Sequence, residues 1–409
     1  MRIGISTSVI QRGKSGVGQY VFALSRGLLA AHHQHKFVLF VLEEDIPLFA
    51  FAKEKAEIVM VPEKFRPPVR NILWHQATLP KLARRLRLDV LHIPSYRRML
   101  WRKPCPLVAT IHDLAPFRLA GKYDWKRMFY GRVVARRLAR RQDRIIAVSE
   151  YTAADIVKFF GLPRERISVI HNGLDHERFY AEKLLKQFYR GHGLAGTLLK
   201  QGVNEIAAGL EPGSREQAKS GVAERFGLKR PFFLYVSRLE HPGKNHLRLI
   251  AAFEDFKSST QSDWQLAFAG GDWHGAERIH EAIGKSKFAS EIRSLGFVPD
   301  EQLPELYRAA DVFVYPSLYE GFGLPPIEAM ACGCPVICST RGALREVIGD
   351  AAAIVEPEDV QSIAEQLRLL ASVEKVRERM RSAGIEHARK FDWNRAAEET
   401  LKVYEGMGG

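Results

Sequence analysis

The chain of 409 residues is too long for one hydrophobic core of usual size, so its length predicts two domains of about 150 to 200 residues. With 46% hydrophobic and 26% charged residues, the composition is that of a globular protein and excludes a disordered or fibrous chain. No apolar run approaches the roughly 20 residues that span a bilayer, and the N-terminus lacks the features of a signal peptide. We expect a cytoplasmic protein, with a peripheral position at the inner face of the cytoplasmic membrane as an alternative.

The formal net charge of +14 is concentrated in the N-terminal half. Residues 64–144 carry 21 Lys and Arg against four Asp, a net charge of +17. Nucleic acid, an anionic membrane surface and a diphosphate-linked acceptor are alternative partners for such a segment, and a solvated surface charge is the simplest interpretation. Because no nucleic-acid-binding motif accompanies the charge, we expect no nucleic-acid partner.

The N-terminal half alternates between apolar β-prone runs and helical patterns. Residues 1–8 predict a strand, and a glycine-bearing loop with Gly13, Gly16 and Gly18 then opens an amphipathic helix, without the spacing of a dinucleotide-binding fingerprint. Further strands are predicted near residues 36–42, 57–61, 89–95 and 107–116, and a basic helix is predicted near 79–87. This alternation predicts a mainly parallel sheet.

His112 is placed at the carboxyl end of the predicted strand 107–116, where open α/β sheets usually bind ligands. Taken alone, a packing role for this histidine is the simpler interpretation. The following segment, 124–142, predicts a very basic helix that either packs its apolar side on the sheet or lies in a headgroup layer. The residues of 181–220 form a glycine-containing insertion to which no function is assigned.

The strand predicted at 232–236 begins the second domain and is followed by Arg238 and Lys244. A guanidinium and an ammonium group together can stabilise a leaving diphosphate where no metal neutralises it, although surface charges after a strand are also common. The chain contains no Asp-x-Asp, and its four cysteines fit neither a redox nor a zinc motif: Cys105, Cys332, Cys334 and Cys338. We therefore expect buried thiols and no metal site.

Residues 311–340 predict a strand, a loop, a helix from about 325 to 331 and another strand. Gly321 and Gly323 allow close approach of a ligand to the loop backbone, and the helix N-terminus favours an anion. Glu320 in the loop and Glu328 in the helix would flank that ligand. The alternative is an ordinary strand-to-helix turn with two solvated glutamates.

Glu320 and Glu328 match the E-x7-E signature, and the segment around them closely resembles that of the family 4 glycosyltransferases. The Arg-x5-Lys spacing of Arg238 and Lys244 is similar to the diphosphate clamp of this family. The segment Thr-Ile-His-Asp-Leu around His112 resembles that of its bacterial mannosyltransferases. The resemblance covers nearly the whole chain, except for the insertion at 181–220.

The resemblance implies an α/β protein of GT-B architecture, with two Rossmann-like domains, an interdomain cleft and a C-terminal helix that returns to the first domain. The implied boundaries are 1–175 for the acceptor-side domain, 176–228 for the linker with its insertion, 229–390 for the donor-binding domain and 391–409 for the returning helix.

The resemblance also implies the roles of individual residues. The implied catalytic residues are Glu320, His112, Arg238 and Lys244. The implied donor-binding residues are Gly16, Gly18, Arg238, Lys244, Val298, Glu320, Gly321, Phe322, Gly323, Leu324 and Glu328. In this scheme Glu320 and His112 approach the donor sugar, Glu328 the ribose hydroxyls, and residues 321–324 the diphosphate.

The expected activity is that of a retaining hexosyltransferase in polysaccharide biosynthesis that needs no cofactor beyond its nucleotide-sugar donor. Mannose from GDP-mannose is the first choice, and the acceptor is expected to be a saccharide or a polyprenyl-diphosphate-linked saccharide. The alternatives are a UDP-hexose-dependent transferase, a sugar-nucleotide epimerase or hydrolase of the same fold, and a protein that binds nucleotide sugars or anionic polymers without catalysis.

Overall fold

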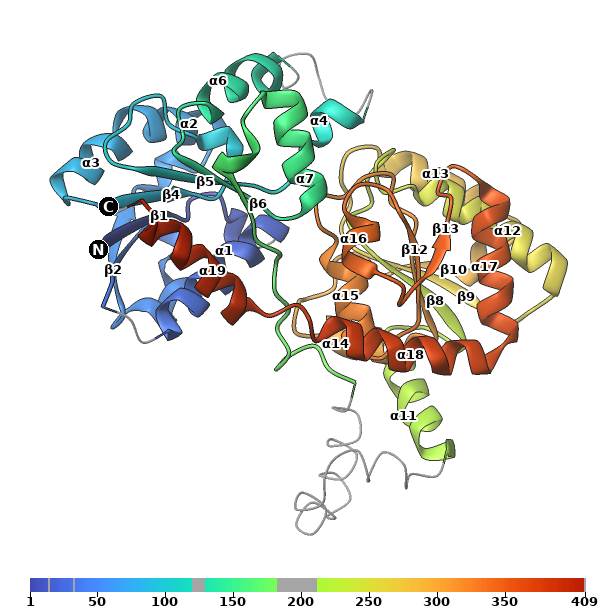
Figure 1. Ribbon diagram of the computed structural model, residues 1–409. Coiled ribbons are helices and arrows are strands. Elements are labelled where there is room, and N and C mark those ends of the chain that lie inside the picture. Colours follow the sequence, from blue (N-terminus) through green and yellow to red (C-terminus); the bar gives the residue numbers. More distant parts are fainter. Residues whose placement is uncertain (14, 32–33, 120–128, 182–211, 408–409) are drawn as a thin grey trace, which may run out of the picture. The chain divides into compact units, whose positions relative to one another are not determined.

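The computed structural model describes residues 1–13, 15–31, 34–119, 129–181 and 212–407 (Figure 1). Contacts between residues divide the chain into two compact units. Unit 1 consists of Met1–Gly173 together with Phe391–Gly409, and unit 2 consists of Leu174–Lys390. Both are α/β units built around one parallel sheet.

The described residues of unit 1 form a seven-stranded sheet in which every neighbouring pair of strands is parallel, in the order β3-β2-β1-β4-β5-β6-β7. The strands are short apolar runs that are buried along most of their length, as expected for a sheet covered on both faces. Their bounds are β1 Arg2–Ser6, β2 Lys36–Leu42, β3 Ala56–Val61, β4 Val90–Ile93, β5 Leu107–Ile111, β6 Arg144–Ala147 and β7 Ile167–Val169.

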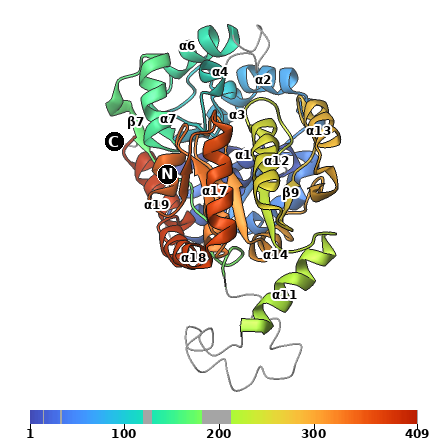
Figure 2. The same cartoon turned by 90° about the vertical axis from the view of Figure 1, so that its right-hand side faces the viewer.

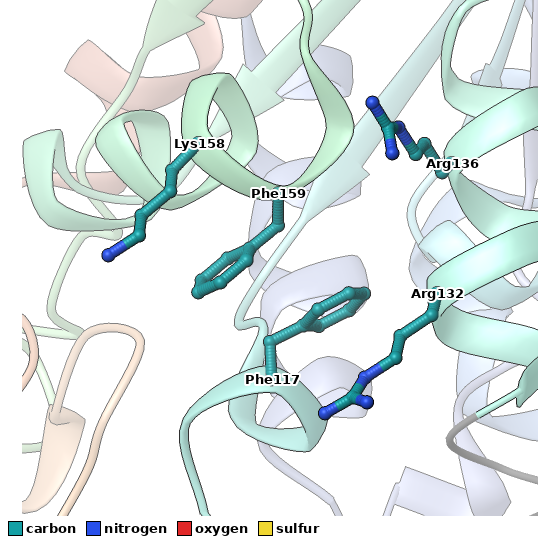
Figure 3. A pocket seen from close by; sticks show the side chains of 5 residues that line it. All are labelled: Phe117, Arg132, Arg136, Lys158 and Phe159. Carbon is teal, nitrogen blue, oxygen red and sulfur yellow. The ribbon is translucent and has the colours of Figure 1, made fainter.

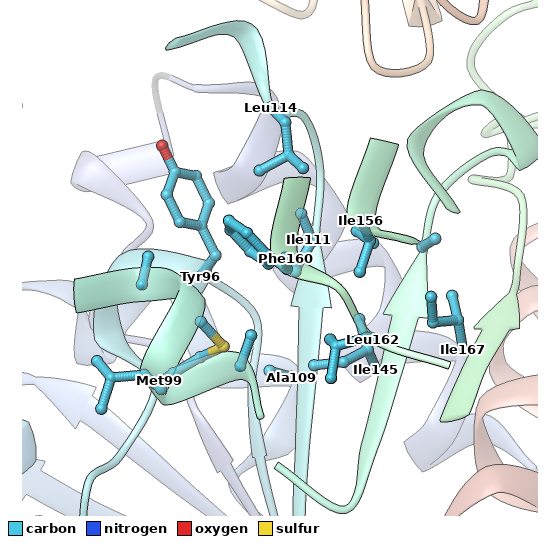
Figure 4. Packing of buried hydrophobic residues seen from close by; sticks show 14 of the residues in the cluster. Tyr96, Met99, Ala109, Ile111, Leu114, Ile145, Ile156, Phe160, Leu162 and Ile167 are labelled. Atoms are coloured by element: carbon cyan, nitrogen blue, oxygen red, sulfur yellow. The ribbon is translucent and has the colours of Figure 1, made fainter. Parts of the chain in front are cut away.

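Alternate residues of β5 point to opposite faces of this sheet. Ala109 and Ile111 join a buried cluster that includes Phe160 and residues of the neighbouring strand β6 (Figure 4). Thr110, between them, instead hydrogen-bonds Tyr20 at 3.0 Å and His92 of β4 at 2.8 Å. The second face therefore contains a buried polar chain.

Helices follow most strands of unit 1, with bounds α1 Gly16–Ala30, α2 Pro68–Ala77, α3 Leu79–Arg85, α4 Ala115–Arg118, α6 Arg136–Ala139, α7 Glu150–Asp155 and α19 Trp393–Glu405. Two π-helical segments, η5 Tyr130–Ala135 and η6 Ile156–Phe160, adjoin α6 and α7. The basic helix expected over 124–142 lies partly outside the described residues, and its described part is η5 followed by α6, which ends at Ala139.

The C-terminal helix α19 belongs to unit 1, where it packs on α1 as the resemblance implied (Figure 1). The helices approach so closely at Gly27 that an added Cβ would lie 2.8 Å from the Cβ of Ala397. The hydroxyl of Tyr404 is hydrogen-bonded to Nδ1 of His92 at 2.7 Å, and both side chains are buried. Burial lowers the pKa of His92 to about 3, so its ring stays neutral and holds one donor and one acceptor in this chain of hydrogen bonds.

Unit 2 contains, within its described residues, a six-stranded parallel sheet in the order β10-β9-β8-β11-β12-β13. Its strands are β8 Phe232–Val236, β9 Gln265–Ala269, β10 Ile292–Ser294, β11 Val312–Tyr315, β12 Val336–Ser339 and β13 Ala353–Val355. Its helices are α11 Pro212–Arg225, α12 His246–Thr260, α13 Ala276–Lys285, α14 Leu303–Ala309, α15 Leu324–Ala331, α16 Leu344–Ile348, α17 Val360–Ser372 and α18 Glu374–Ala388. Helices α12 and α17 lie side by side (Figure 2).

Of the insertion at 181–220, residues 182–211 lie outside the described residues, and the part from Pro212 onward is the start of α11. Helix α11 packs on α14 within unit 2.

The buried hydrogen bond between Tyr404 and His92 is expected to hold α19 on unit 1. Tyr404→Phe should lower the free energy of unfolding by about 1 to 2 kcal/mol, because a ring nitrogen of His92 loses its partner inside the fold. Urea denaturation followed by circular dichroism measures the change. Lys402→Ala, at an exposed position of the same helix, is the control and should change stability by less than about 0.5 kcal/mol. Equal stabilities of Tyr404→Phe and the parent would contradict this account.

Candidate functional site

The sheet of unit 2 changes its direction of strand addition between β8 and β11. Strands β9 and β10 are added on one side of β8, and β12 and β13 on the far side of β11. The loops that leave the carboxyl ends of β8 and β11 therefore diverge, which is the place where open α/β sheets bind ligands. Lys244 lies in the loop after β8 and Glu320 in the loop after β11.

Lys244 and Glu320 form an ion pair, with Nζ 2.6 Å from Oε1. Two hydroxyl groups donate to the same oxygen, that of Tyr315 at 2.9 Å and that of Ser317 at 2.6 Å. Both charged side chains are largely buried, with exposed fractions of 16% for Lys244 and 15% for Glu320. Every hydrogen bond that the described residues donate to this carboxylate goes to Oε1, so Oε2 is available to a ligand.

The electrostatic balance at Glu320 favours its ionised form. Burial raises the pKa of its carboxyl group, but the charge of Lys244 and the hydrogen bonds from Lys244, Ser317 and Tyr315 outweigh burial and lower the pKa below its usual value. Glu320 is therefore a carboxylate at neutral pH. It can accept hydrogen bonds or stabilise positive charge, but it has no proton to donate.

Backbone hydrogen bonds join the loops that hold these two residues. The N–H of Leu318 donates to the carbonyl of Gly243 at 2.9 Å, and the side chain of Asn245 donates to the carbonyl of Pro316 at 3.0 Å. On the other side, Gly342 has a φ of +67°, and an added Cβ would lie 2.2 Å from the carbonyl oxygen of Glu320. Only glycine fits there, so the position of Glu320 depends on it.

Arg238, the other residue of the expected clamp, lies apart from this ion pair. Its guanidinium is 3.4 Å from Oε2 of Glu240 and 4.6 Å from the centre of the Trp273 ring. The side chain is 48% exposed. None of the described contacts joins Arg238 to Lys244, so the structure places a buried cation and a solvent-accessible cation in the same loop.

Glu328 lies in α15 and has surroundings different from those of Glu320. The hydroxyl of Tyr307 donates to its Oε2 at 2.9 Å. Burial raises the pKa of Glu328 to about 7, because the hydrogen bond from Tyr307 and the charge of Arg178 oppose the burial only in part, while Asp300 adds a further raising effect. The ionised and neutral forms of Glu328 are therefore both populated near neutral pH.

The loop 321–323 enters α15 through Gly323, whose φ of +102° is in the left-handed region. The helix begins at Leu324, one residue before the expected start. Its next two residues, Pro325 and Pro326, have no N–H group, so only two of the first four helical positions can donate to an anion. The anion site expected here therefore depends more on the loop amides than on the helix.

Val298, one of the expected donor-binding residues, is 7% exposed and lies between β10 and α14. Its neighbour Phe297 is 58% exposed and lies beside Gly271, whose added Cβ would be 3.8 Å from the Cβ of Phe297. A flat apolar side chain is thus presented next to a glycine, which is a suitable surface for stacking of a ring.

The expected residues of unit 1 occur where the sheet reverses between β1 and β4, and on the adjacent strand β5. The side chain of Ser15 caps α1 by accepting a hydrogen bond from the N–H of Gly18 at 3.1 Å, so this N–H cannot donate to a ligand. Gly16, in contrast, is exposed at the first helical position. His112 follows β5, and its Nε2–H donates to the carbonyl of Pro94 at 3.2 Å. Burial lowers the pKa of His112 to about 4, which leaves a neutral ring with Nδ1 as an acceptor.

Sequence reasoning did not identify the residues that support the two glutamates. Tyr315 and Ser317 precede Glu320 by five and three residues, so their position at the end of the same strand was a local signal. Tyr307 and Arg178 are distant from Glu328 in the chain and gave no such signal.

Among the described residues, no group of three or more His, Cys, Asp or Glu side chains is placed to hold a metal ion. The described helices include none that is long and apolar enough to cross a membrane.

Solved structures share this two-unit fold. A glycosyltransferase from Rickettsia africae has a TM-score of 0.68 and 17% identity, covering 99% of this chain and 98% of its own. HepE of Anabaena, solved with UDP and glucose, has a TM-score of 0.70 and 17% identity, covering 99% of this chain and 100% of its own. The fold is therefore the GT-B architecture of glycosyltransferases.

Family models match both units of the chain. Residues 217–387 match the model described as glycosyl transferases group 1, and residues 14–178 match the model described as glycosyltransferase family 4. The O-antigen chain mannosyltransferase B of Escherichia coli is 26% identical over 99% of this chain and 100% of its own length. The chain therefore contains a glycosyltransferase family 4 domain and a glycosyl transferases group 1 domain, and it is an enzyme that transfers sugars.

The ion pair of Lys244 and Glu320 predicts a pH-dependent coupling in stability. Lys244→Met should lower the free energy of unfolding by about 2 to 3 kcal/mol at pH 7, because the carboxylate loses its cation in a largely buried place. The double variant with Glu320→Gln should recover most of the loss. Urea denaturation of the parent, both single variants and the double variant gives the coupling energy.

The direction of the pH effect follows from the lowered pKa of Glu320. A carboxyl group of lowered pKa stabilises the fold above its unfolded pKa, and this contribution is lost as pH falls through the folded pKa. The difference between Lys244→Met and the parent should therefore shrink in acid. A difference that stays constant from pH 7 to pH 3 would contradict the assignment.

Proposed function

We propose that the chain is a retaining hexosyltransferase that moves mannose from GDP-mannose to a hydroxyl of a saccharide or lipid-linked saccharide during polysaccharide assembly. The similarity to the O-antigen chain mannosyltransferase over both full lengths supports the sugar and the process. HepE, which shares the fold, binds UDP and glucose, and this supports a nucleotide-sugar donor. A UDP-hexose is the second choice of donor.

The observation that carries the proposal is the ion pair of Lys244 with Glu320 at the switch point of the unit 2 sheet. Breaking an anomeric bond develops positive charge on the sugar and negative charge on the diphosphate. A cation and a carboxylate held next to each other match both charges. In this proposal Lys244 donates a hydrogen bond to the diphosphate, and Oε2 of Glu320 accepts a hydrogen bond from a hydroxyl of the sugar.

Arg238 has a separate role in the proposal, because it is exposed and the described contacts of its guanidinium are with Trp273 and Glu240. Moving toward a diphosphate costs Arg238 a cation–π contact and a long ion pair, each of which contributes little at an exposed site. We assign it to the leaving group once the donor is bound. The loop amides of residues 321–324 are assigned to the same diphosphate.

The nucleoside and the sugar are assigned to the remaining residues. Glu328, with its pKa near 7, accepts hydrogen bonds from the ribose hydroxyls when it is ionised, and Val298 lies along the base. His112 is assigned to the sugar as a hydrogen-bonding group through its acceptor nitrogen. The glycine loop is assigned to the phosphates through Gly16, because the N–H of Gly18 already donates to Ser15. Glu320 is assigned a binding role and no acid role, because its carboxyl group is ionised.

The decisive experiment measures binding and transfer with the same set of donors. Calorimetry with GDP, UDP, ADP and their sugars identifies the base, and transfer to oligosaccharide and prenyl-diphosphate-linked acceptors identifies the reaction. Turnover without any acceptor would favour an epimerase or hydrolase, and binding without turnover would favour a binding protein. A β-linked product from an α-linked donor would refute retention.

Lys244→Ala and Arg238→Ala are expected to reduce kcat/KM for the preferred donor by an amount equivalent to about 2 to 4 kcal/mol, because each removes a charge from the leaving diphosphate. Lys244→Ala should have the larger effect, since Lys244 is the more buried cation. Steady-state assays in the presence of a chelator provide the measurement. Full activity in both variants, or loss of parental activity to the chelator, would contradict the role of these cations.

The pKa of about 7 for Glu328 predicts that affinity for the free nucleoside diphosphate rises with pH. Ionisation through a pKa of about 7 creates the carboxylate that accepts the ribose hydroxyls, so affinity should increase up to about tenfold between pH 6 and pH 8. Calorimetry of the parent and Glu328→Gln tests this, since the variant should lose the dependence that the parent shows beyond the titration of the nucleotide itself. Glu320→Gln should retain the pH dependence and the nucleotide affinity but lose transfer. The reverse pattern would reject the two assignments.

A further inference from the structure

A cavity of about 360 Å³ opens in unit 1, and none of the residues assigned above lines it. It is lined by Phe117, Arg132, Arg136, Lys158 and Phe159 (Figure 3). Phe117 comes from α4, the two arginines from η5 and α6, and the other two residues from η6. The cavity thus combines three cationic side chains with two aromatic rings.

The aromatic rings form a fixed apolar wall. Phe117 and Phe159 are stacked, with ring centres 4.9 Å apart and planes inclined by 28°. Both are half-buried and pack against the hydrophobic cluster of unit 1 that contains Ile111 and Phe160. Because the core holds them from behind, the rings can contact a ligand without first losing much side-chain freedom.

The three cations of the cavity are not neutralised by the described part of the chain. No carboxylate within the described ranges lies within ion-pair distance of Arg132, Arg136 or Lys158. Arg118, next to Phe117, differs because its Nε donates to the buried carboxylate of Asp155 at 3.1 Å. Lys158 lies 5.5 Å from the centre of the Phe159 ring, so its charge is held beside the apolar wall.

This combination is suited to one class of ligand. One guanidinium group can donate two parallel hydrogen bonds to the oxygens of a phosphate. Several cations around one cavity match the negative charge of a diphosphate. The stacked rings match an apolar or glycosyl group joined to that diphosphate. A free inorganic anion would use the cations and leave the rings without a partner.

We propose that this cavity binds an organic diphosphate, with the phosphates on Arg132, Arg136 and Lys158 and the attached carbon skeleton on Phe117 and Phe159. The diphosphate that links a prenyl lipid to the acceptor saccharide has this chemistry. Identifying the ligand as the acceptor rests on the proposed transfer reaction, whereas the binding itself does not.

Calorimetry of the full chain with farnesyl diphosphate and with inorganic diphosphate tests the cavity. The organic probe should bind at least about tenfold more tightly, because only it covers the aromatic wall. The double variant Arg132→Ala with Arg136→Ala should weaken the organic probe by at least about tenfold. Because Lys244 is assigned to the donor diphosphate, any probe bound at the donor site of unit 2 should be lost in Lys244→Ala, whereas the binding that the double variant weakens should remain.

Arg137→Ala is the matched control, since Arg137 is exposed in the same helix and does not line the cavity. It should change the affinity less than about twofold, as expected for one distant surface charge. An equal loss in Arg137→Ala and the double variant would overturn the proposal in favour of nonspecific attraction. Equal affinities for the organic and inorganic probes, or no binding of either, would also overturn it.

Binding experiments with vesicles distinguish two possible ligands of the cavity, a membrane headgroup and the diphosphate of a lipid-linked acceptor. If phosphatidylglycerol vesicles displace farnesyl diphosphate from the parent and bind less to the double variant, the cavity is a phosphate site whose ligand is a membrane headgroup. If they do not displace it, the acceptor is the ligand. In the second case the double variant should raise KM for a prenyl-diphosphate-linked acceptor at least about tenfold and leave KM for a phosphate-free oligosaccharide unchanged. If the parent binds farnesyl diphosphate in the cavity but transfers no sugar to any acceptor, the proposed reaction is refuted and the proposed ligand site is not.

Discussion

The geometry of unit 2 depends on a buried ion pair at the point where its sheet changes direction. Neither the ammonium of Lys244 nor the carboxylate of Glu320 could be removed from water alone without a large cost in free energy. The loops after β8 and β11 must therefore meet, and the hydrogen bonds of Leu318 and Asn245 hold them together. The left-handed Gly342 lets a third loop close over the backbone of Glu320. The ion pair of Lys244 and Glu320 therefore stabilises the fold and also places two opposite charges next to each other.

The two glutamates of the signature differ because their neighbours differ. Glu320 faces a lysine, and the pKa of its carboxyl group is lowered although the group is buried. Glu328 faces the hydroxyl of Tyr307, which compensates less for burial, and its pKa rises to about 7. The pKa values of two identical side chains eight residues apart are thus shifted in opposite directions. In the proposed reaction this separates a permanent charge beside the sugar from a titrating group beside the nucleoside.

Unit 1 uses its polar groups in two distinct ways. Thr110, His92 and Tyr404 form a buried chain that links the sheet to the C-terminal helix, and it involves no net charge because the pKa of His92 is far below neutrality. The described basic residues of segment 64–144 lie mainly at the surface, where some are paired with carboxylates, as Lys103 is with Asp143. Those around the cavity of Phe117 and Phe159 have no described carboxylate partner and lie next to apolar rings. A positively charged segment is therefore not uniform, and its local surroundings decide which ligands it can bind.

The sequence by itself predicted the parallel α/β fold from the periodicity of its apolar residues, and the resemblance of the segment around Glu320 and Glu328 implied the glycosyltransferase family and the returning helix. It also placed Arg238, Lys244 and His112 at strand ends. Only the tertiary structure decided that Lys244 pairs with Glu320 while Arg238 contacts Trp273, and that Tyr307 and Arg178 surround Glu328. The physical reason is that strand order in a parallel sheet is set by crossover connections, so residues that determine charge and pKa come from segments far apart in the chain.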